Sequence, residues 1–478
     1  MRRRRDLGGR NTRFDHAVGH DACVTAEETA REEEPPMPLL QPILRPPSAV
    51  QPFAALGSSL QGAFDRDLHD FCRNAMMRWH AAPATLPDLG PQRSLAAQQA
   101  TEAKTDRFLE RLEGTLRRGA RRPKQRQRTE RRLEHLIRDF ARDARLMPAE
   151  QLDRIGSEAL FAVTEDFLRQ AHAFDAQLTP EDRFQALRNV WIMNLLQQIL
   201  GQPVSLTPAM VGYSLLYPFT DNWLDDPAIS EGAKRAFCSR LARRLAGECL
   251  AASSEHEQAV FALVAKIEQV FPRARFPGVY HSLLAIHRGQ MASLRLQGRE
   301  AVPQRRILET SLAKGGASVL ADGYLVAGTL DRATADFCFG YGAALQLIDD
   351  LQDLDDDRRA GHRTIFSDPG DAGAQDPLVM KLIHFLDSVL ERPRHRASRT
   401  RTVLLDLVRD NCVQMILFAA GNHAERFRPS FVATLESRAV MRFAYAQRCT
   451  KTVRERAERL GETLRHSPLA ELVVARHR

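Results

Sequence analysis

The chain has 478 residues, of which 44% are hydrophobic, so it can bury a sizeable core. Its formal net charge is +8, and its seven cysteines stand singly, without the CxxC pairs of a zinc site or the spacing of a disulfide framework. No apolar run approaches the roughly 18 residues of a membrane span, and the charged N-terminus has no apolar segment behind it as in a secretory signal. We therefore expect a reducing, cytoplasmic location.

The first 57 residues are expected to form a disordered tail, because they are rich in arginine and proline and lack helical periodicity. Met37 is an alternative to Met1 as the start of the protein. Residues 58–147 are strongly charged but have a helical pattern of apolar positions, so we expect a charged helical N-terminal extension.

Residues 117–132 of this extension carry nine basic side chains and one acidic side chain. Such a run can bind nucleic acid or an anionic membrane surface, or it can be a solvated linker. No aromatic side chains are interleaved with the basic ones, and Pro123 interrupts the run. We favour the linker, expect no nucleic-acid partner, and keep contact with anionic lipid as the alternative.

Residues 148–478 show a succession of long amphipathic helices separated by proline, glycine and capping residues. Strand-like alternation is absent, so the expected fold class is all-α, a large helical bundle in one domain. The expected helices span about 160–167, 184–199, 207–226, 231–251, 255–271, 277–297, 304–328, 332–354, 377–391, 399–420 and 431–463.

The helix expected at 207–226 is apolar nearly all round in its first half and should be buried. It nevertheless ends in acidic residues. Asp221 and Asp225 stand four positions apart, which places them one turn apart on the same face, and Tyr217 precedes them on that face. Buried carboxylates are costly unless a cation neutralises them, so a divalent metal is the expected partner.

The helix expected at 332–354 ends in six aspartates between Asp349 and Asp357. An ordinary solvated acidic face is the simpler interpretation. Against it, the acidic face continues backwards through Gln346 to Gly342 and Phe339, as it would if it pointed into an enclosed cavity.

Asp349 and Asp353 repeat the four-residue spacing of the first acidic pair. Hard oxygen ligands of this kind suit Mg²⁺, which commonly bridges to a substrate phosphate. Asp355 and Asp356 point off this face and are expected to be solvated, whereas Asp357 can belong to either set.

Several motifs resemble those of trans-prenyltransferases, which belong to the class I isoprenoid synthases. Asp349, Asp350 and Asp353, preceded by Gln346, resemble the family's second motif, F-Q-x-x-D-D-x-x-D. The stretch "DNWLD" at 221–225 resembles the first motif, D-D-x-x-D. "HRGQMASL" resembles the G-Q-x-x-D helix and keeps Gln290. The resemblance covers roughly residues 180–365.

The resemblance implies a bundle of the isoprenoid synthase type, in which two aspartate-bearing helices face each other across a central cavity. Its metal ligands and catalytic residues would be Asp221, Asn222, Asp225, Asp349, Asp350 and Asp353. A cluster of about three Mg²⁺ ions would hold the diphosphate of an allylic isoprenyl substrate, so that its C–O bond ionises.

The resemblance also implies substrate-binding residues. The candidates for contact with the diphosphate are Gln346, Gln290, Lys314, Arg288 and Arg363. Tyr217 and Phe339 would line the cavity and stabilise cations through their ring faces. Arg442 and Tyr445, near the end of a late helix, would help to close the site.

The chain departs from the elongating enzymes at their second substrate site. The family's G-G-K-x-x-R-P and R-R-G stretches are missing, and Glu309 stands where a diphosphate-binding lysine is usual. These losses spare ionisation and affect the acceptor, so we favour cyclisation or elimination, as in a terpene synthase. Chain elongation with isopentenyl diphosphate and a non-catalytic partner subunit are the alternatives, and a homodimer is the expected assembly.

Overall fold

The computed structural model describes residues 55–120, 126–144, 148–155, 157–294, 296, 302–367, 373–395 and 397–464. The chain divides into two units, Met1–Pro38 and Leu39–Arg478. The first unit, and with it nearly all of the expected tail, lies outside the described residues.

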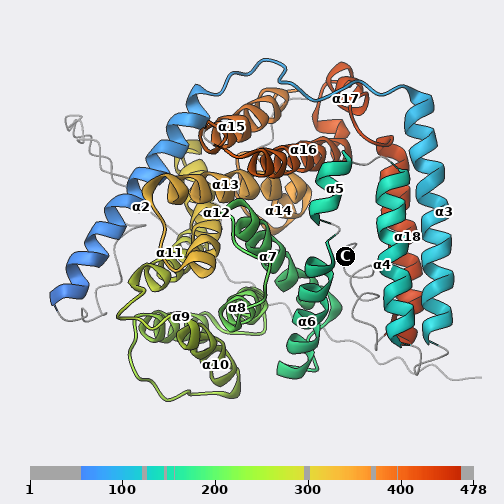
Figure 1. Cartoon of the computed structure of the whole chain (residues 1–478). Helices are drawn as coiled ribbons and strands as arrows, with labels where there is room; N and C mark the ends of the chain where they lie inside the picture. The colour runs from blue at the N-terminus through green and yellow to red at the C-terminus, as the bar shows by residue number, and fades with distance from the viewer. Residues whose placement is uncertain are drawn as a thin grey trace, which may run out of the picture. The chain divides into compact units, whose positions relative to one another are not determined.

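The described part of the chain is all-α, as the sequence predicted, with seventeen α-helices, a short 3-10 helix and no strand (Figure 1). None of its helices is both long and apolar enough to cross a membrane. The helices are α2 Ala55–Ala81, α3 Leu95–Ala120, α4 Arg126–Asp143, α5 Ala149–Ile155, α6 Glu158–Phe174, α7 Pro180–Ile199, α8 Pro208–Asp225, α9 Glu231–Leu245, α10 Glu255–Val270, α11 Pro277–Leu294, α12 Gln304–Ala327, α13 Arg332–Gln352, α14 Leu354–Ala360, α15 Asp376–Arg394, α16 Arg399–Asn422, η2 Ala424–Arg426, α17 Pro429–Glu436 and α18 Phe443–Leu464.

Capping residues explain where the helices near the predicted acidic site begin. The Thr207 side chain accepts a hydrogen bond from the Met210 N–H at 3.2 Å, and Pro208 is the first residue of α8, as expected. Thr179 and Asp182 form a reciprocal capping box at the start of α7. Local sequence therefore determines where α7 and α8 begin.

Helix α12 separates two hydrophobic cores. Leu312 and Leu320 belong to a core with side chains of α2, α13, α15 and α16, whereas Ala321 and Leu325 belong to a second core with side chains of α6–α11. All four side chains are at most 1% exposed. A helix that is buried on all sides in this way reads as apolar nearly all round, and this explains its weak amphipathic pattern.

Helix α2 is part of the first core, which corrects the expected boundary near residue 148. Phe71 contacts Phe339 of α13, with ring centroids 6.1 Å apart, and Trp79 contacts Phe385 of α15 edge-to-face at 6.0 Å. The charged extension therefore does not form a separate core: its first helix supplies aromatic side chains to the main bundle.

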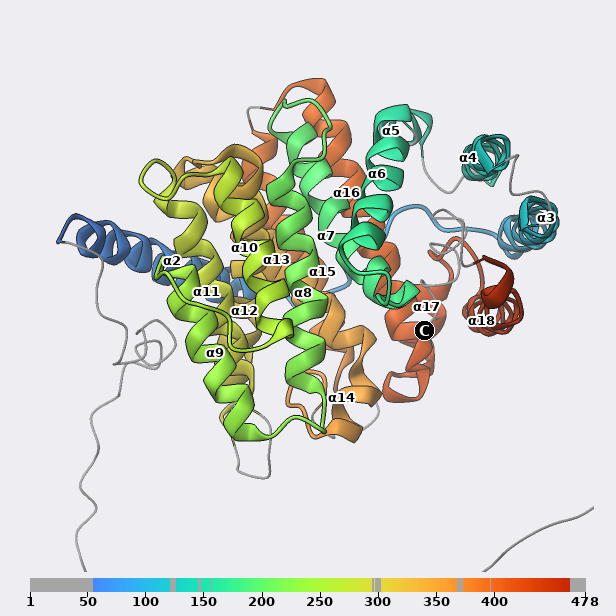
Figure 2. The same ribbon diagram turned by 90° about the horizontal axis from the view of Figure 1, so that it is seen from below.

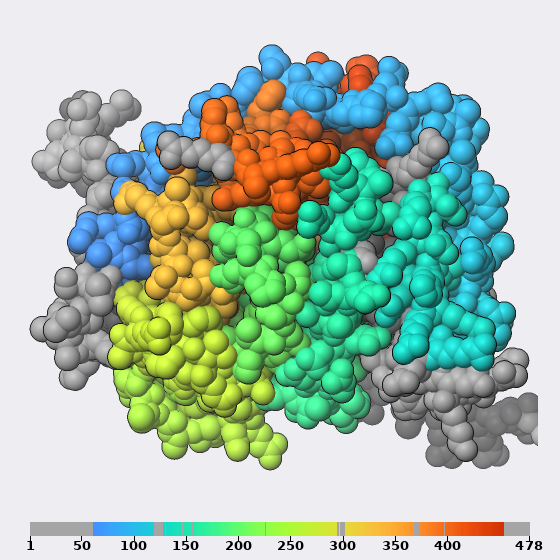
Figure 3. Space-filling model, in the orientation of Figure 1, coloured from blue at the N-terminus to red at the C-terminus, as the bar shows by residue number. Residues whose placement is uncertain are grey.

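The segment that follows α2 crosses the C-terminal helices, as Figures 1 and 3 show. Arg409 of α16 donates to the Asp88 carbonyl at 2.7 Å, and Arg438, just after α17, donates to the Gly90 carbonyl at 2.6 Å. These bonds tie the extension to helices more than 300 residues later in the chain.

Helices α3, α4 and α18 pack together, and two expected site residues hold this contact. Phe108 of α3 and Phe140 of α4 stack with centroids 4.2 Å apart. Arg442 pairs with Glu102 of α3 at 2.9 Å, and the Tyr445 hydroxyl donates to Asp106 at 2.8 Å. Arg442 and Tyr445 therefore fasten α18 to α3, which corrects their expected place at the acidic site.

The basic run at 117–132 forms the end of α3 and the start of α4, and residues 121–125 lie outside the described part. These two helices pack against each other. The described parts of the run, 117–120 and 126–132, are therefore helical, and both the solvated linker and the contact with anionic lipid stay predictions.

The small residues that precede the aspartates of α13 mark a close helix contact. A Cβ built on Gly342 would lie 2.2 Å from the Gly315 carbonyl oxygen of α12, and the Phe339 ring covers Gly316. Only glycine permits two helix backbones to approach this closely. Gly342 and Phe339 therefore pack against α12, which corrects the interpretation that this stretch points into a cavity.

Candidate active site

The end of α8 carries the first acidic group. Asp221 is half-buried, and its Oδ1 atom lies 3.4 Å from the Thr220 hydroxyl. Tyr217 lies one turn earlier and is 37% exposed, but protein atoms crowd its hydroxyl. This burial raises the pKa of Tyr217 well above its usual value, and the charge of Asp221 raises it further. The four-residue spacing thus brings Tyr217 and Asp221 together, as the sequence predicted.

Asn222 does not join this group. Its side-chain amide donates to the Asp182 carboxylate at 2.6 Å, beside the capping box of α7. The rotation of about 100° per residue turns Asn222 away from Asp221, which corrects its expected role as a metal ligand. The backbone of Asp225 is helical, but its side chain lies outside the described part, so its role stays a prediction.

The end of α13 carries the second acidic group. The Asp349 side chain is 42% exposed, and its Oδ1 atom lies 3.7 Å from a guanidinium nitrogen of Arg188 on α7. Asp353 lies one turn further on, at the bend between α13 and α14. Crowding by protein atoms and repulsion by Asp349 raise the pKa of Asp353 to about 6. The two carboxylates are therefore close enough to disfavour each other's charge.

Asp350 lies beneath this exposed pair and is 5% exposed. Gln346 donates its side-chain amide to Oδ1 at 2.8 Å. Oδ2 has no hydrogen-bond partner among the described residues, although the Ser311 hydroxyl of α12 lies near enough to lower the pKa. Burial outweighs both contacts and raises the pKa of Asp350 to about 7.

Asp357, which the sequence allowed on either face, joins the acidic residues. Its side chain is 17% exposed, and an oxygen lies 3.5 Å from His362 Nδ1. Burial, and then the charges of Asp353 and Asp349, raise the pKa of Asp357 to about 7, while Lys314 of α12 lowers it. Lys314 is therefore within electrostatic reach of this group, as its assignment as a diphosphate-binding residue requires.

Both acidic helix ends lie within electrostatic reach of Tyr217. The charges of both Asp221 and Asp349 raise the pKa of Tyr217, and Arg188 lowers it. Arg188 also lowers the pKa of Asp353. The end of α8 and helix α14 lie at the same end of the bundle in Figure 2. We call the described carboxylates of this site the acidic cluster: Asp221, Asp349, Asp350, Asp353 and Asp357.

The other expected diphosphate-binding residues, Arg288, Gln290 and Arg363, differ in burial and in the partners that they contact. Arg288 of α11 forms an ion pair with Asp65 of α2 at 2.8 Å, and its side chain is 9% exposed. This buried pairing corrects its expected role. Gln290 is half-buried, and the adjacent Gly289 packs on the backbone of Lys314. Arg363 is half-buried after α14, and its role stays a prediction.

Phe339 is a packing residue and not part of the acidic site. It is 1% exposed, and its ring lies between Gly316 of α12 and Phe71 of α2. Its expected contact with a substrate cation is therefore replaced by contacts within the first core.

The two aspartates expected to be solvated are both accessible to solvent. The Asp356 side chain is 69% exposed and pairs with Arg359. The Asp355 side chain is 41% exposed, but it also binds His423 and Arg426, each at 3.1 Å. No pattern in the sequence indicated these partners, because they come from a segment 68 or more residues later in the chain.

The donor set of the acidic cluster suits a hard divalent cation. All its donors are carboxylate oxygens, which Mg²⁺ prefers. Three of its pKa values are raised, and Oδ2 of the buried Asp350 has no partner among the described side chains, so the negative charge is incompletely balanced. Among the described residues, no three of these carboxylates bring ligand oxygens within 4.8 Å of one another, so binding of an ion by Asp221, Asp349 and Asp353 stays a prediction.

Sequence reasoning missed Arg188 and Ser311. Arg188 interrupts the apolar stretch "FQALRNVWIMNLL" of α7, and a lone arginine in such a stretch was the available signal. Ser311 gave no comparable signal, because its contact with Asp350 depends on the packing of α12 against α13.

Comparisons with known proteins assign no function to the chain. No protein family matches the sequence, and no curated protein matches it. Among solved structures, the chain is similar to a geranylgeranyl pyrophosphate synthetase from the archaeon Geoglobus acetivorans, with 13% sequence identity and a TM-score of 0.34. The match covers 54% of this chain and 99% of that chain. A likeness this low carries no argument about function.

Proposed function

We propose that this protein is a Mg²⁺-dependent enzyme that ionises an allylic isoprenyl diphosphate. The observation that carries the proposal is that Asp221 of α8 and Asp349 of α13 both act on Tyr217, while Arg188 lies 3.7 Å from Asp349. It is supported by the resemblance of these same helix ends to the two aspartate-rich motifs of class I isoprenoid synthases.

The described side chains can divide the work of ionisation. The acidic cluster would hold the metal, and Arg188 and Lys314 would bind diphosphate oxygens through charge-assisted hydrogen bonds. Bound Mg²⁺ would neutralise the charge that builds up on the departing diphosphate. The C–O bond then breaks, its electron pair leaves with the diphosphate, and an allylic cation remains.

We favour an intramolecular fate for that cation, by cyclisation or elimination. Glu309 is 3% exposed and pairs with Arg305 at 3.2 Å. Its negative charge also raises the pKa of Cys72 on α2. A buried acid at this place offers nothing to a second diphosphate, because like charges repel. Chain elongation with isopentenyl diphosphate remains the alternative.

Product analysis separates these outcomes. The protein would be incubated with Mg²⁺ and C10, C15 or C20 allylic diphosphates, each with and without isopentenyl diphosphate. We expect a hydrocarbon or alcohol from one allylic substrate alone. Longer diphosphates that form only with the second substrate would sink the intramolecular outcome and leave ionisation standing. Release of no diphosphate under any condition would favour the non-catalytic subunit.

A further inference from the structure

The bend between α13 and α14 sets the direction of part of the acidic cluster. Helix α13 ends at Gln352, α14 begins at Leu354, and Asp353 between them adopts φ −94° and ψ 12°. The last four carbonyls of a helix have no partner within that helix, and the Gln352 carbonyl is one of them. What binds this carbonyl therefore influences how the chain turns at Asp353.

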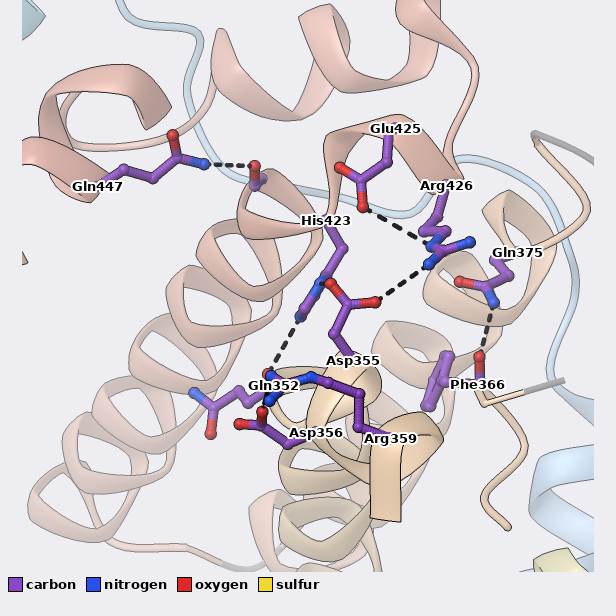
Figure 4. Close-up of polar contacts among 11 residues, drawn as sticks. Gln352, Asp355, Asp356, Arg359, Phe366, Gln375, His423, Glu425, Arg426 and Gln447 are labelled. Carbon is purple, nitrogen blue, oxygen red and sulfur yellow. Dashed lines mark hydrogen bonds and ion pairs between the residues drawn. The ribbon is translucent and has the colours of Figure 1, made fainter. Parts of the chain in front are cut away.

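His423 binds the Gln352 carbonyl. It follows the last residue of α16 and is 7% exposed. Its Nε2 atom lies 3.1 Å from the Gln352 oxygen, and Nδ1 lies 3.1 Å from Asp355 Oδ2 (Figure 4). Since a carbonyl and an ionised carboxylate only accept hydrogen bonds, each ring nitrogen acts as a donor in this arrangement. One ring thus touches the last turn of α13 and the first turn of α14.

Arg426 strengthens this attachment. It donates to Asp355 Oδ1 at 3.1 Å, so both oxygens of Asp355 are held by the segment that follows α16. Helix α14 has seven residues, which is too short to be stable without such contacts. We call His423, Arg426 and Asp355 the bracket.

Two members of the acidic cluster, Asp353 and Asp357, lie next to the bracket in the chain. Asp353 lies between Gln352 and Asp355, and Asp357 lies half a turn beyond Asp355 on α14. The Asp357 N–H also donates to the Asp353 carbonyl at 2.8 Å, which joins the backbones of the two residues directly. A change in the bend at Asp353 would therefore displace both carboxylates relative to Asp349 on α13.

We infer that His423 is a positioning residue that holds Asp353 and Asp357 in the geometry required to bind metal and diphosphate. This inference rests on the proposed function of the acidic cluster. His423 acts through the Gln352 carbonyl and Asp355, in the way that an outer ring of hydrogen bonds orients the ligands of a metal site.

A metal ion held by Asp355, His423 and Glu425 is the competing explanation. Ligand atoms of Asp355, His423 and Glu425 lie within 4.8 Å of one another. However, the Arg426 guanidinium pairs with both acids, at 3.1 Å from Asp355 and 3.7 Å from Glu425. This cation already balances the charge there, so we favour the positioning role.

Four variants test the inference by Mn²⁺ titration in the presence of inorganic pyrophosphate, with kcat and KM for the allylic substrate. His423→Ala should weaken Mn²⁺ binding by about 10- to 100-fold. His423→Gln should recover most of the loss, because its amide nitrogen can reach the Gln352 carbonyl. His423→Asn places its amide near Nδ1 and should recover less. Glu425→Gln should behave as wild type. Near-UV circular dichroism would check that each variant folds.

The outcomes separate failure of the inference from failure of the proposed function. If Asp349→Ala loses Mn²⁺ and His423→Ala does not, the positioning role is overturned and the function stands. If the wild type binds no Mn²⁺ with pyrophosphate, the proposed function fails. If Glu425→Gln loses as much Mn²⁺ affinity as His423→Ala, a metal ion held by Asp355, His423 and Glu425 replaces the positioning role.

Discussion

Asp350 combines burial and negative charge in one side chain, and this gives it a measurable pH dependence. Its pKa is raised to about 7 in the folded protein, chiefly by burial. In the unfolded chain the carboxyl has its ordinary pKa of about 3.9. The folded state therefore holds the proton over a pH range in which the unfolded state has lost it. The contribution of this group to stability is lost as the pH rises through about 7.

We predict that Asp350→Asn removes this dependence. In the presence of EDTA, the free energy of unfolding of the variant should rise relative to wild type between about pH 4 and pH 8, because asparagine cannot ionise. Urea unfolding at several pH values measures the difference. A difference that stays constant across this range would contradict the raised pKa.

Arg188 lies 3.7 Å from Asp349 of the acidic cluster. If it binds diphosphate, Arg188→Ala should lower kcat/KM by about 10- to 100-fold, since hydrogen bonds to charged groups contribute about 1.5–3 kcal/mol. Steady-state kinetics would measure this change. Arg169→Ala is the matched control, because that arginine is 71% exposed and pairs with Asp166 on its own helix, α6. Equal kinetics for both variants would remove Arg188 from the site.

Among individual residues, the sequence correctly predicted the contacts that follow from helical spacing. The pairing of Tyr217 with Asp221 and the succession of Asp349 and Asp353 follow from residues one turn apart. The ion pairs of Arg288 with Asp65 and of Asp355 with His423 join positions far apart in the chain. No local pattern contains such contacts, so the role expected for Arg288 was wrong and the partners of Asp355 were missed.

The contact between α12 and α13 depends on two glycines. A Cβ on Gly315 would lie 2.3 Å from Gln346 Cβ and 2.5 Å from the Gly342 carbonyl oxygen. This contact places Gln346, and through it Asp350, against α12. The helices would have to separate to accept a side chain, and the acidic cluster would shift with α13.

We predict that Gly315→Ala destabilises the protein by about 1–3 kcal/mol, because it overpacks a tight helix contact. Gly232→Ala in α9 is the matched control: nothing lies within 4 Å of its Cβ. The control should be neutral or should stabilise the protein by up to about 1 kcal/mol, because alanine favours helix. Urea unfolding measures both. Similar stability of the two variants would contradict the close approach.

The elements themselves were largely predictable, because caps and apolar periodicity are local. The exceptions have tertiary causes. The helix expected at 332–354 ends at Gln352, and a second short helix, α14, follows the bend at Asp353; the His423–Gln352 contact that accompanies this bend comes from a distant segment. The helix expected at about 431–463 is two helices, α17 and α18, and residues 437–442 separate them.

The whole bundle is more continuous than the sequence suggested. Helix α2 lies within the charged extension, yet Phe71 and Trp79 pack in the first core with α13 and α15. The extension looked separable because its charge density is high, but charge is carried by the outward face of a helix while its inward face enters the core. Fold class followed from periodicity; the assignment of α2 to the core required the tertiary structure.

The central claim is that the acidic cluster binds metal and ionises an allylic diphosphate, and Mg²⁺-dependent diphosphate release tests it most directly. Wild type, Asp349→Ala and Asp356→Asn would be compared with the same allylic substrate. Asp356 is the control, because it is 69% exposed and pairs with Arg359. We predict release by wild type and Asp356→Asn that EDTA abolishes, and loss of at least about 100-fold in Asp349→Ala. Equal release by wild type and Asp349→Ala, or none from either, would contradict the claim.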